Sequence, residues 1–202
     1  MSRPRSAVRT AFCAALGLCL ALTAALAQPV RPNSPPAQAS PSPLRPDDAF
    51  GVEVTLTEKI IVYRAGKATW KNAFVTLIAA FKAINDYLDK ESIAPDGPAM
   101  TVYTQIDDAG FAYRAALPVA VAPKTTPGGG IAVGKSPAGK ALKFVHRGSF
   151  DSMDLTYEAI ANYLEEKRME AKDLIVEEYA ADPSEATEET LVVNIFVFIE
   201  PQ

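Results

Sequence analysis

An acidic residue inside an apolar strand is the feature that most constrains how this chain folds. Residues 143–183 are predicted to form a strand, a tight turn, an amphipathic helix and a second strand, which contains Glu177. Side chains alternate between the two faces of a strand, so Glu177 shares a face with Ile175 and Tyr179. Glu178 points the opposite way. Burying a carboxylate without a partner costs several kcal/mol. We therefore expect Glu177 to lie in a ligand pocket between two similar halves of the chain.

A second interpretation places Glu177 at the rim of the sheet, or in a salt bridge with Arg64 or Arg114 from the other half. If Glu177 is instead buried among aromatic rings, desolvation raises its pKa and a bound cation lowers it again. Each ring face adds a cation–π attraction of ~0.5–2 kcal/mol. A place in the core is the alternative for each aromatic candidate: Trp70, Tyr63, Tyr103, Tyr113, Phe150, Tyr157, Tyr179 and Phe196.

The N-terminal segment, residues 1–27, has the features of a secretory signal peptide. Three arginines precede an apolar run over residues 11–27, and Ala25-Leu26-Ala27 forms a small-residue cleavage site before Gln28. The alternative is an uncleaved membrane anchor, but the run is short for a spanning helix and rich in alanine. We expect cleavage after Ala27, a periplasmic or secreted mature protein, and no stable membrane insertion after cleavage.

Removal of this segment changes what the mature chain contains. Cys13 and Cys19 both lie in it, so the mature chain has no thiol, disulfide or cysteine-based metal site. Three positive charges are also lost, which takes the formal net charge from −4 to −7. An acidic exported protein is a poor candidate for nucleic-acid binding. Residues 28–48 contain seven prolines and are predicted to be a disordered or polyproline-like linker.

Residues 49–202 are predicted to be one domain made of two repeats, about 50–122 and 130–200. Each repeat has the order strand–helix–strand–strand, and a shift of 76 residues places Tyr87 on Tyr163 and Tyr103 on Tyr179. The first repeat is expected to contain strands 52–56 and 59–63, a turn at 64–67, helix 72–89, and a hairpin of 100–104 with 111–119. The second is expected to contain strands 131–133 and 141–145, a helix from Asp151 or Ser152, and strands 174–180 and 191–199. This order predicts an α+β fold with helices on one face of an antiparallel sheet.

Several short motifs, in this order and spacing, resemble the GyrI-like small-molecule-binding domain, which is also the effector-binding part of some AraC-type and multidrug-sensing regulators. The motifs are Tyr113–Val119, Ile131–Gly134, Ser136–Lys140, His146–Phe150, Glu177–Tyr179 and Asp182-Pro183. The resemblance implies a concave antiparallel sheet built from two repeats, with two helices flanking a central groove. It also implies that aromatic residues line this groove around one buried glutamate, which pairs with cationic, lipophilic ligands. Glu177 matches that glutamate.

The chain departs from the family pattern at two points. An acid that is frequent in the family's last strand falls on Asn194, which removes one negative charge and puts selectivity for cations in doubt. No helix-turn-helix precedes the domain in this sequence, so a role in transcription is not carried over.

Other motifs do not support a catalytic, phosphate-binding or metal-binding site. His146 is the only histidine, and Ser149 and Asp151 are near it only in sequence, so a structural role in the turn is expected. One histidine without cysteine does not make a zinc site. Residues 129–136 match a phosphate-binding loop, but Pro137 and Gly139 prevent a helix from starting at the lysine. The acidic residues near 185–189 lack calcium-loop spacing.

The sequence therefore predicts an exported, monomeric protein that binds an apolar or cationic organic molecule around Glu177, with no cofactor, no metal and no nucleic-acid partner. The expected ligand-binding residues are Glu177, Tyr179, Tyr103, Tyr113, Trp70, Phe150, Tyr157, Asn194 and Phe196. Two alternatives remain: a hydrolase of small electrophilic compounds that uses Glu177 as base or nucleophile, and a periplasmic protein-interaction module.

Overall fold

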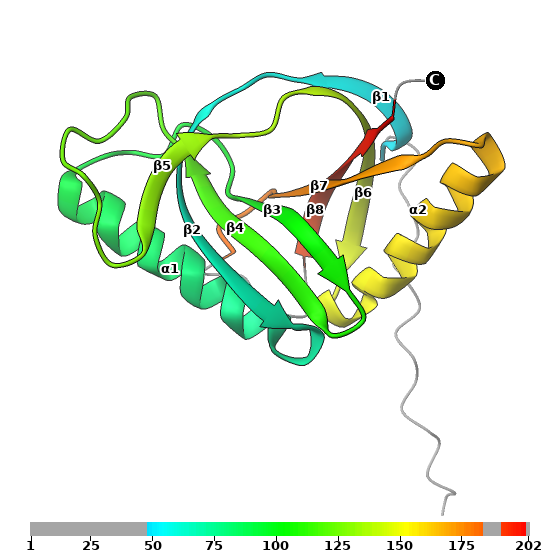
Figure 1. The fold of residues 1–202 in the computed structure, drawn as a ribbon, viewed down its shortest axis with the longest axis horizontal. Helices are drawn as coiled ribbons and strands as arrows, with labels where there is room; N and C mark the ends of the chain where they lie inside the picture. Colours follow the sequence, from blue (N-terminus) through cyan, green and yellow to red (C-terminus); the bar gives the residue numbers. More distant parts are fainter. Residues whose placement is uncertain (1–47, 184–190, 201–202) are drawn as a thin grey trace, which may run out of the picture. The chain divides into compact units, whose positions relative to one another are not determined.

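An eight-stranded antiparallel sheet and two helices form the part of the chain that the computed structural model describes, residues 48–183 and 191–200 (Figure 1). The first repeat contains β1 (Phe50–Leu56), β2 (Ile60–Thr69), α1 (Ala73–Glu91), β3 (Met100–Asp107) and β4 (Gly110–Pro118). The second contains β5 (Ile131–Lys135), β6 (Gly139–Gly148), α2 (Met153–Lys167), β7 (Ala171–Tyr179) and β8 (Leu191–Ile199). The predicted α+β fold is confirmed. The predicted signal peptide, nearly all of the proline-rich linker and the acidic loop lie outside the described residues.

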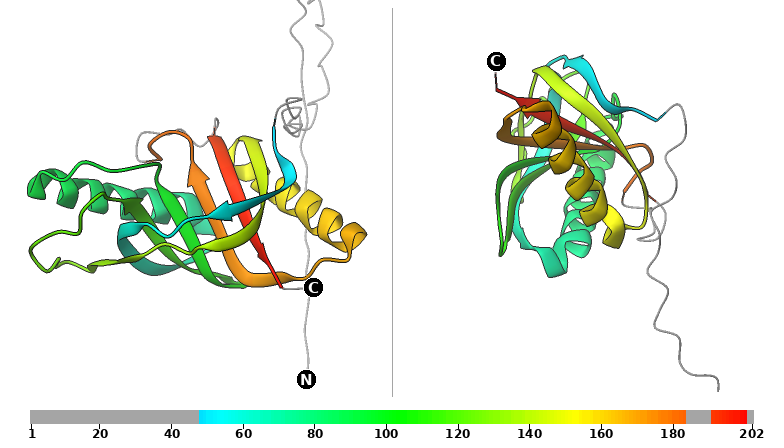
Figure 2. Two further views of the ribbon diagram at one scale, coloured as in Figure 1. Left: turned by 90° about the horizontal axis from the view of Figure 1, so that it is seen from above. Right: turned by 90° about the vertical axis from the view of Figure 1, so that its right-hand side faces the viewer.

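The first strand of each repeat pairs with the other repeat. The strand order is β1-β6-β8-β7-β3-β4-β2-β5, so β1 extends the second repeat and β5 extends the first. The sequence predicted β5 and β6 on either side of a turn, but they do not pair with each other. The sheet is strongly curved (Figure 2), and the segments after β1 and β5 hydrogen-bond to each other through the backbones of Lys59 and Ser136. These segments tie the two repeats together.

The two repeats end their helices in the same way. Ser92 after α1 and Arg168 after α2 both adopt a left-handed conformation with φ of 55°, and they are 76 residues apart, which equals the shift in the sequence alignment of the repeats. The next residues, Ile93 and Met169, donate backbone hydrogen bonds to Leu88 and Leu164 respectively. The 19 residues of α1 and 15 of α2 differ by one turn, and this turn lies at the N-terminal end of α1.

Each face of the sheet carries its own apolar cluster. Both helices pack on one face, against alternate residues of the strands that include Val62, Tyr103 and Tyr179. The opposite face carries a smaller cluster that includes Met100, Val176 and Phe196, partly covered by β1. Within the described residues, neither α1 nor α2 has the combination of length and hydropathy that a membrane-spanning helix requires.

Residues Arg64–Lys67 form part of β2, so the predicted turn at this position is wrong. Gly66, which suggested the turn, pairs with Tyr113 of β4. A Cβ atom at Gly66 would lie 2.7 Å from the Tyr113 hydroxyl oxygen. Glycine is therefore needed at this position because a neighbouring side chain approaches the strand closely, and not because the chain turns.

We expect Gly66→Ala to lower the free energy of unfolding by about 1–3 kcal/mol, because the added methyl group overpacks the contact with Tyr113. Denaturant unfolding monitored by circular dichroism measures this change. Gly128→Ala is the matched control, since no atom lies within 4 Å of its Cβ position, and it should change stability little. An equal effect of the two substitutions would contradict this account of Gly66.

Candidate functional site

Glu177 lies at the centre of the sheet, where the two repeats meet. It stands directly opposite Thr101 in the antiparallel pairing of β7 with β3, and Val102 and Val176 are opposite each other at the neighbouring position. The shift of 76 residues that relates the repeats also relates Thr101 to Glu177, so these two residues occupy equivalent positions. The Glu177 side chain is only 1 % exposed, which excludes a position at the rim.

Three tyrosine hydroxyl groups donate hydrogen bonds to the Glu177 carboxylate. Tyr103 and Tyr179 each donate to Oε2 at 2.8 Å, and Tyr157 of α2 donates to Oε1 at 2.6 Å. The hydroxyl groups of Thr101 and Tyr179 are 3.0 Å apart. Because the Tyr179 hydrogen points at Glu177, Thr101 is the donor in this pair. Oε2 thus has one donor from each repeat, and Oε1 has one donor from the second repeat.

The hydroxyl cage (Tyr103, Tyr157, Tyr179 and Glu177) is only partly symmetric. Tyr103 and Tyr179 are equivalent in the two repeats. Tyr157 corresponds to Phe81 of α1, which lacks a hydroxyl group and instead packs edge-on against Tyr179, with ring centroids 5.5 Å apart. The second repeat therefore supplies the acid and the donor from a helix, and the first supplies Thr101 and an apolar ring.

Burial is the largest cause of the raised pKa values of the four cage residues. Desolvation raises the pKa of Glu177, and the hydrogen bonds from the three tyrosines oppose this shift. Desolvation, together with the nearby Glu177 charge, raises the pKa of Tyr103, Tyr157 and Tyr179 well above its usual value. The cage therefore carries at most one negative charge at neutral pH.

Among the described residues, no ion pair involves Glu177. Arg114 lies over the Tyr63 ring at 5.6 Å, and Arg64 is exposed. Neither of these predicted alternative partners reaches the carboxylate. The buried acid is satisfied by neutral donors alone.

One further predicted site residue, Trp70, connects the cage with the surface. Trp70 is 48 % exposed, and its indole N–H donates to the Asp107 carbonyl at 2.9 Å. Its ring packs on Phe111 at 5.0 Å, and Phe111 packs in turn on Tyr103 at 5.1 Å and on Tyr113 at 5.9 Å. A series of three aromatic rings in contact thus leads from Trp70 through Phe111 to Tyr103, one of the three tyrosines that donate to Glu177.

Phe150, another predicted site residue, lines the same small cavity as Tyr179. Its ring packs against Phe74 of α1 with centroids 5.3 Å apart, so it bridges the start of one helix and the turn before the other. Phe74, Phe81, Phe150 and Tyr179 are among the residues that line a cavity of about 10 Å³. This volume is at the lower limit for one water molecule.

Asn194 and Phe196 are not brought to Glu177. Both belong to β8, but they face the opposite side of the sheet, because it is Ile195 that pairs with Glu177. The Asn194 amide donates to Glu178 Oε1 at 3.2 Å, and Phe196 packs with Met100 and Val176. The site therefore draws on β3, β7 and α2, together with the aromatic residues of β4 and α1.

The prediction missed Thr101, Phe81 and Phe111. Thr101 had a clear signal, because the repeat alignment that pairs Tyr103 with Tyr179 also pairs Thr101 with Glu177. Phe81 would follow from the same alignment, opposite Tyr157. For Phe111 the sequence contained only its place in a predicted strand.

His146 has a supporting position beside the cage. Its Nε2 is 3.1 Å from the Ser149 carbonyl oxygen and must donate to it, so Nδ1 accepts from the Thr156 hydroxyl at 2.7 Å. Burial lowers the pKa of His146. These contacts fasten β6 to α2 one residue before Tyr157.

The phosphate-loop pattern does not form a phosphate-binding loop, and the acidic residues near 185–189 lie outside the described residues. Ile131–Lys135 form β5, no helix begins at Lys135, and its ammonium group pairs with Glu58 at 2.6 Å. Within residues 48–183 and 191–200, no group of three or more His, Cys, Asp or Glu residues is placed to hold a metal ion.

Comparisons with known proteins agree with this architecture. The sequence profile of the GyrI-like small molecule binding domain matches residues 52–200. The structure is similar to the EcmrR C-terminal domain, with a TM-score of 0.58, 16% identity, and coverage of 75% of this chain and 97% of that domain. EcmrR in its DNA complex gives a TM-score of 0.62 at 16% identity over 75% of this chain, which spans only 57% of that protein.

A further similar structure contains a ligand. It is SAV2435 bound to tetraphenylphosphonium, with a TM-score of 0.52, 11% identity, and coverage of 74% of this chain and 93% of SAV2435. No curated protein sequence matches this chain. The match over residues 52–200, together with the two-repeat sheet and its paired helices, shows that the chain belongs to the GyrI-like small molecule binding domain family.

Proposed function

We propose that this domain binds small apolar or cationic organic molecules between its helices and sheet, with Glu177 as the polar anchor. The observation that carries the proposal is a carboxylate, 1 % exposed, whose partners are three tyrosine hydroxyl groups. An acid in such a place costs free energy when ionised, because hydroxyl dipoles only partly replace water. A cationic ligand recovers this cost.

The surroundings of Glu177 favour a lipophilic cation over an anion. Tyr103, Tyr157 and Tyr179 surround the carboxylate with aromatic side chains, and each ring face that a bound cation contacts adds ~0.5–2 kcal/mol of attraction. An anion would instead meet the negative carboxylate and find no basic partner in the cage. The tetraphenylphosphonium bound by SAV2435 belongs to this ligand class and supports the proposal.

Ligand entry requires part of the domain to move. The cavity beside Tyr179 is about 10 Å³, whereas organic ligands occupy pockets of roughly 300–1,000 Å³. Of the two helices, α2 buries only Met153 and Ile160, whereas α1 buries six residues. Displacing α2 therefore exposes less apolar surface than displacing α1. Because α2 carries Tyr157, its movement also frees one oxygen of Glu177 for the ligand.

Three probes of matched shape test the proposal: tetraphenylphosphonium, the anion tetraphenylborate, and neutral triphenylphosphine oxide. We expect the phosphonium to bind most tightly, measured by isothermal titration calorimetry. At a hundredfold excess over its dissociation constant it should stabilise the fold by about 2.7 kcal/mol. Glu177→Gln, which keeps the shape of the side chain, should weaken phosphonium binding by about tenfold or more.

Glu165→Gln on the exposed side of α2 is the matched control and should leave the affinity unchanged. Equal phosphonium affinity in the Glu177→Gln variant, or tighter binding of the borate, would contradict a role for Glu177 as anchor.

A further inference from the structure

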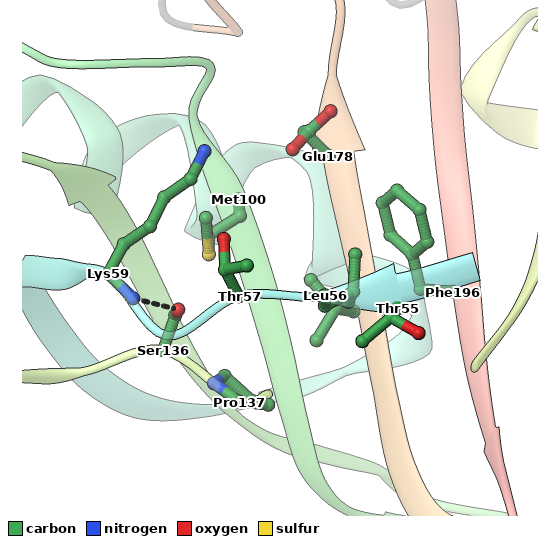
Figure 3. A pocket seen from close by; sticks show the side chains of 10 residues that line it. Thr55, Leu56, Thr57, Lys59, Met100, Ser136, Pro137, Glu178 and Phe196 are labelled. Carbon is green, nitrogen blue, oxygen red and sulfur yellow. Dashed lines mark hydrogen bonds between the residues drawn. The ribbon is translucent and has the colours of Figure 1, made fainter. Parts of the chain in front are cut away.

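A second cavity lies on the face of the sheet opposite Glu177. It has a volume of about 170 Å³ and forms where the segments after β1 and β5 cross the central strands (Figure 3). The backbone N–H of Lys59 donates to the Ser136 hydroxyl at 3.0 Å, and the Ser136 N–H donates to the Lys59 carbonyl at 2.9 Å. These reciprocal hydrogen bonds fix the wall of the cavity.

The floor of this cavity is apolar and buried. Met100, Val176 and Phe196 come from three neighbouring strands at the centre of the sheet, and each is at most 6 % exposed. Leu56 of β1 adds a further apolar side chain. The floor is therefore suited to a short hydrocarbon chain.

Two opposite charges line the cavity without pairing. Among the described residues, no ion pair joins Lys59 and Glu178, although both side chains contribute to the lining (Figure 3). The Asn194 amide donates to Glu178 Oε1 at 3.2 Å and orients the carboxylate. The Ser136 hydroxyl accepts from Lys59 N–H, so its own hydrogen is available to a further acceptor. The cavity thus offers an anionic group, a cationic group and a hydroxyl donor around an apolar floor.

The volume limits what this cavity can hold. It has room for several water molecules or one small organic molecule, and it is below the roughly 300–1,000 Å³ that drug-sized ligands occupy. A lipophilic cation of the kind proposed for Glu177 is too large. We propose that this cavity binds small ω-amino acids, with the ligand ammonium at Glu178, its carboxylate at Lys59 and its methylene chain on Met100, Val176 and Phe196.

A series of probes of increasing length tests this site: γ-aminobutyrate, δ-aminovalerate and ε-aminocaproate. Valerate and pentylamine are the matched compounds with a single charge. We expect at least one amino acid to bind the purified protein with one-to-one stoichiometry by calorimetry, and each single-charge compound to bind about tenfold more weakly. Lys59→Met and Glu178→Gln should each weaken amino-acid binding by a similar factor.

The exposed residues Lys90 and Glu165 provide charge-matched controls, and Lys90→Met and Glu165→Gln should bind like the unaltered protein. Both pocket substitutions preserve the backbone hydrogen bonds of Lys59 and an acceptor for Asn194, and thermal unfolding checks that each variant is folded. The proposal is overturned if no amino acid binds at a concentration of about 10 mM. A ligand with a dissociation constant of about 1 mM would nearly saturate the site at this concentration. It is also overturned if valerate and pentylamine bind as tightly as the amino acids do. Unchanged amino-acid affinity in both the Lys59→Met and the Glu178→Gln variants overturns it as well.

Discussion

The contribution of Glu177 to the free energy of unfolding should fall as the pH rises above about 4.5, the usual pKa of a glutamate, and Glu177→Gln should abolish this contribution. Burial raises the pKa of Glu177 in the folded protein, so the folded state holds its proton at a higher pH than the unfolded state does. The stabilisation is complete below pH 4.5 and is lost as the pH passes through the raised pKa. One proton gives a slope of up to about 1.4 kcal/mol per pH unit in this window.

Denaturant unfolding at a series of pH values measures this slope. His146 contributes in the opposite sense, because burial lowers its pKa and stability is lost as the pH falls below its usual value of 6.5. The Glu177→Gln variant lacks the Glu177 contribution, so its free energy of unfolding should only rise with pH in the acidic range, as His146 loses its proton. Glu165→Gln should retain the slope of the unaltered protein. The same slope in the Glu177→Gln variant would show that another group is responsible.

Removing one hydroxyl group from the cage should have a second large effect. Tyr157→Phe leaves Glu177 Oε1 without its donor at 2.6 Å, and hydrogen bonds to charged groups contribute about 1.5–3 kcal/mol. We expect a loss of this size when Glu177 is ionised, and a smaller loss when it is protonated. The pKa of Glu177 should rise further, since one opposing hydrogen bond is gone.

Tyr87→Phe is the matched control for this substitution. The Tyr87 hydroxyl is buried on α1 without a hydrogen-bond partner in the described part of the chain, so its removal should be neutral or stabilising. Chemical denaturation of both variants on either side of the Glu177 titration measures the difference. A Tyr157→Phe variant as stable as Tyr87→Phe at high pH would mean that this hydroxyl group does not support the carboxylate.

Local patterns in the sequence predicted much of the site. Alternation along the strand placed Glu177 and Tyr179 on one face, and the helical spacing of apolar residues placed α1 within two residues of its observed ends. The repeat alignment at 76 residues agrees with the matching helix ends at Ser92 and Arg168. These features depend on neighbours in the chain, so they are visible without a structure.

Features that depend on distant contacts were not predicted. Which face Asn194 and Phe196 occupy follows from the register of β8 on β7, and a slip of one residue reverses it. The exchange of β1 and β5 between repeats has no local signal, because each strand pairs with a partner far along the chain. Gly66 was predicted to lie in a turn, since glycine is common in turns. The actual reason for glycine, the close approach of Tyr113 from β4, is a long-range contact that the local sequence does not show.

The direct opposition of Thr101 and Glu177 has a consequence for how such a domain arises. A single repeat could form this sheet only as a homodimer that exchanges its first strands, and its twofold axis would pass between positions 101 and 177. Two acids there would face each other at about 5 Å in an apolar interior and repel. Joining two copies in one polypeptide removes this conflict, since one copy can keep the acid while the other acquires a hydroxyl group that supports it. Gene fusion thus allows a lone buried charge that an exact dimer of identical chains cannot have.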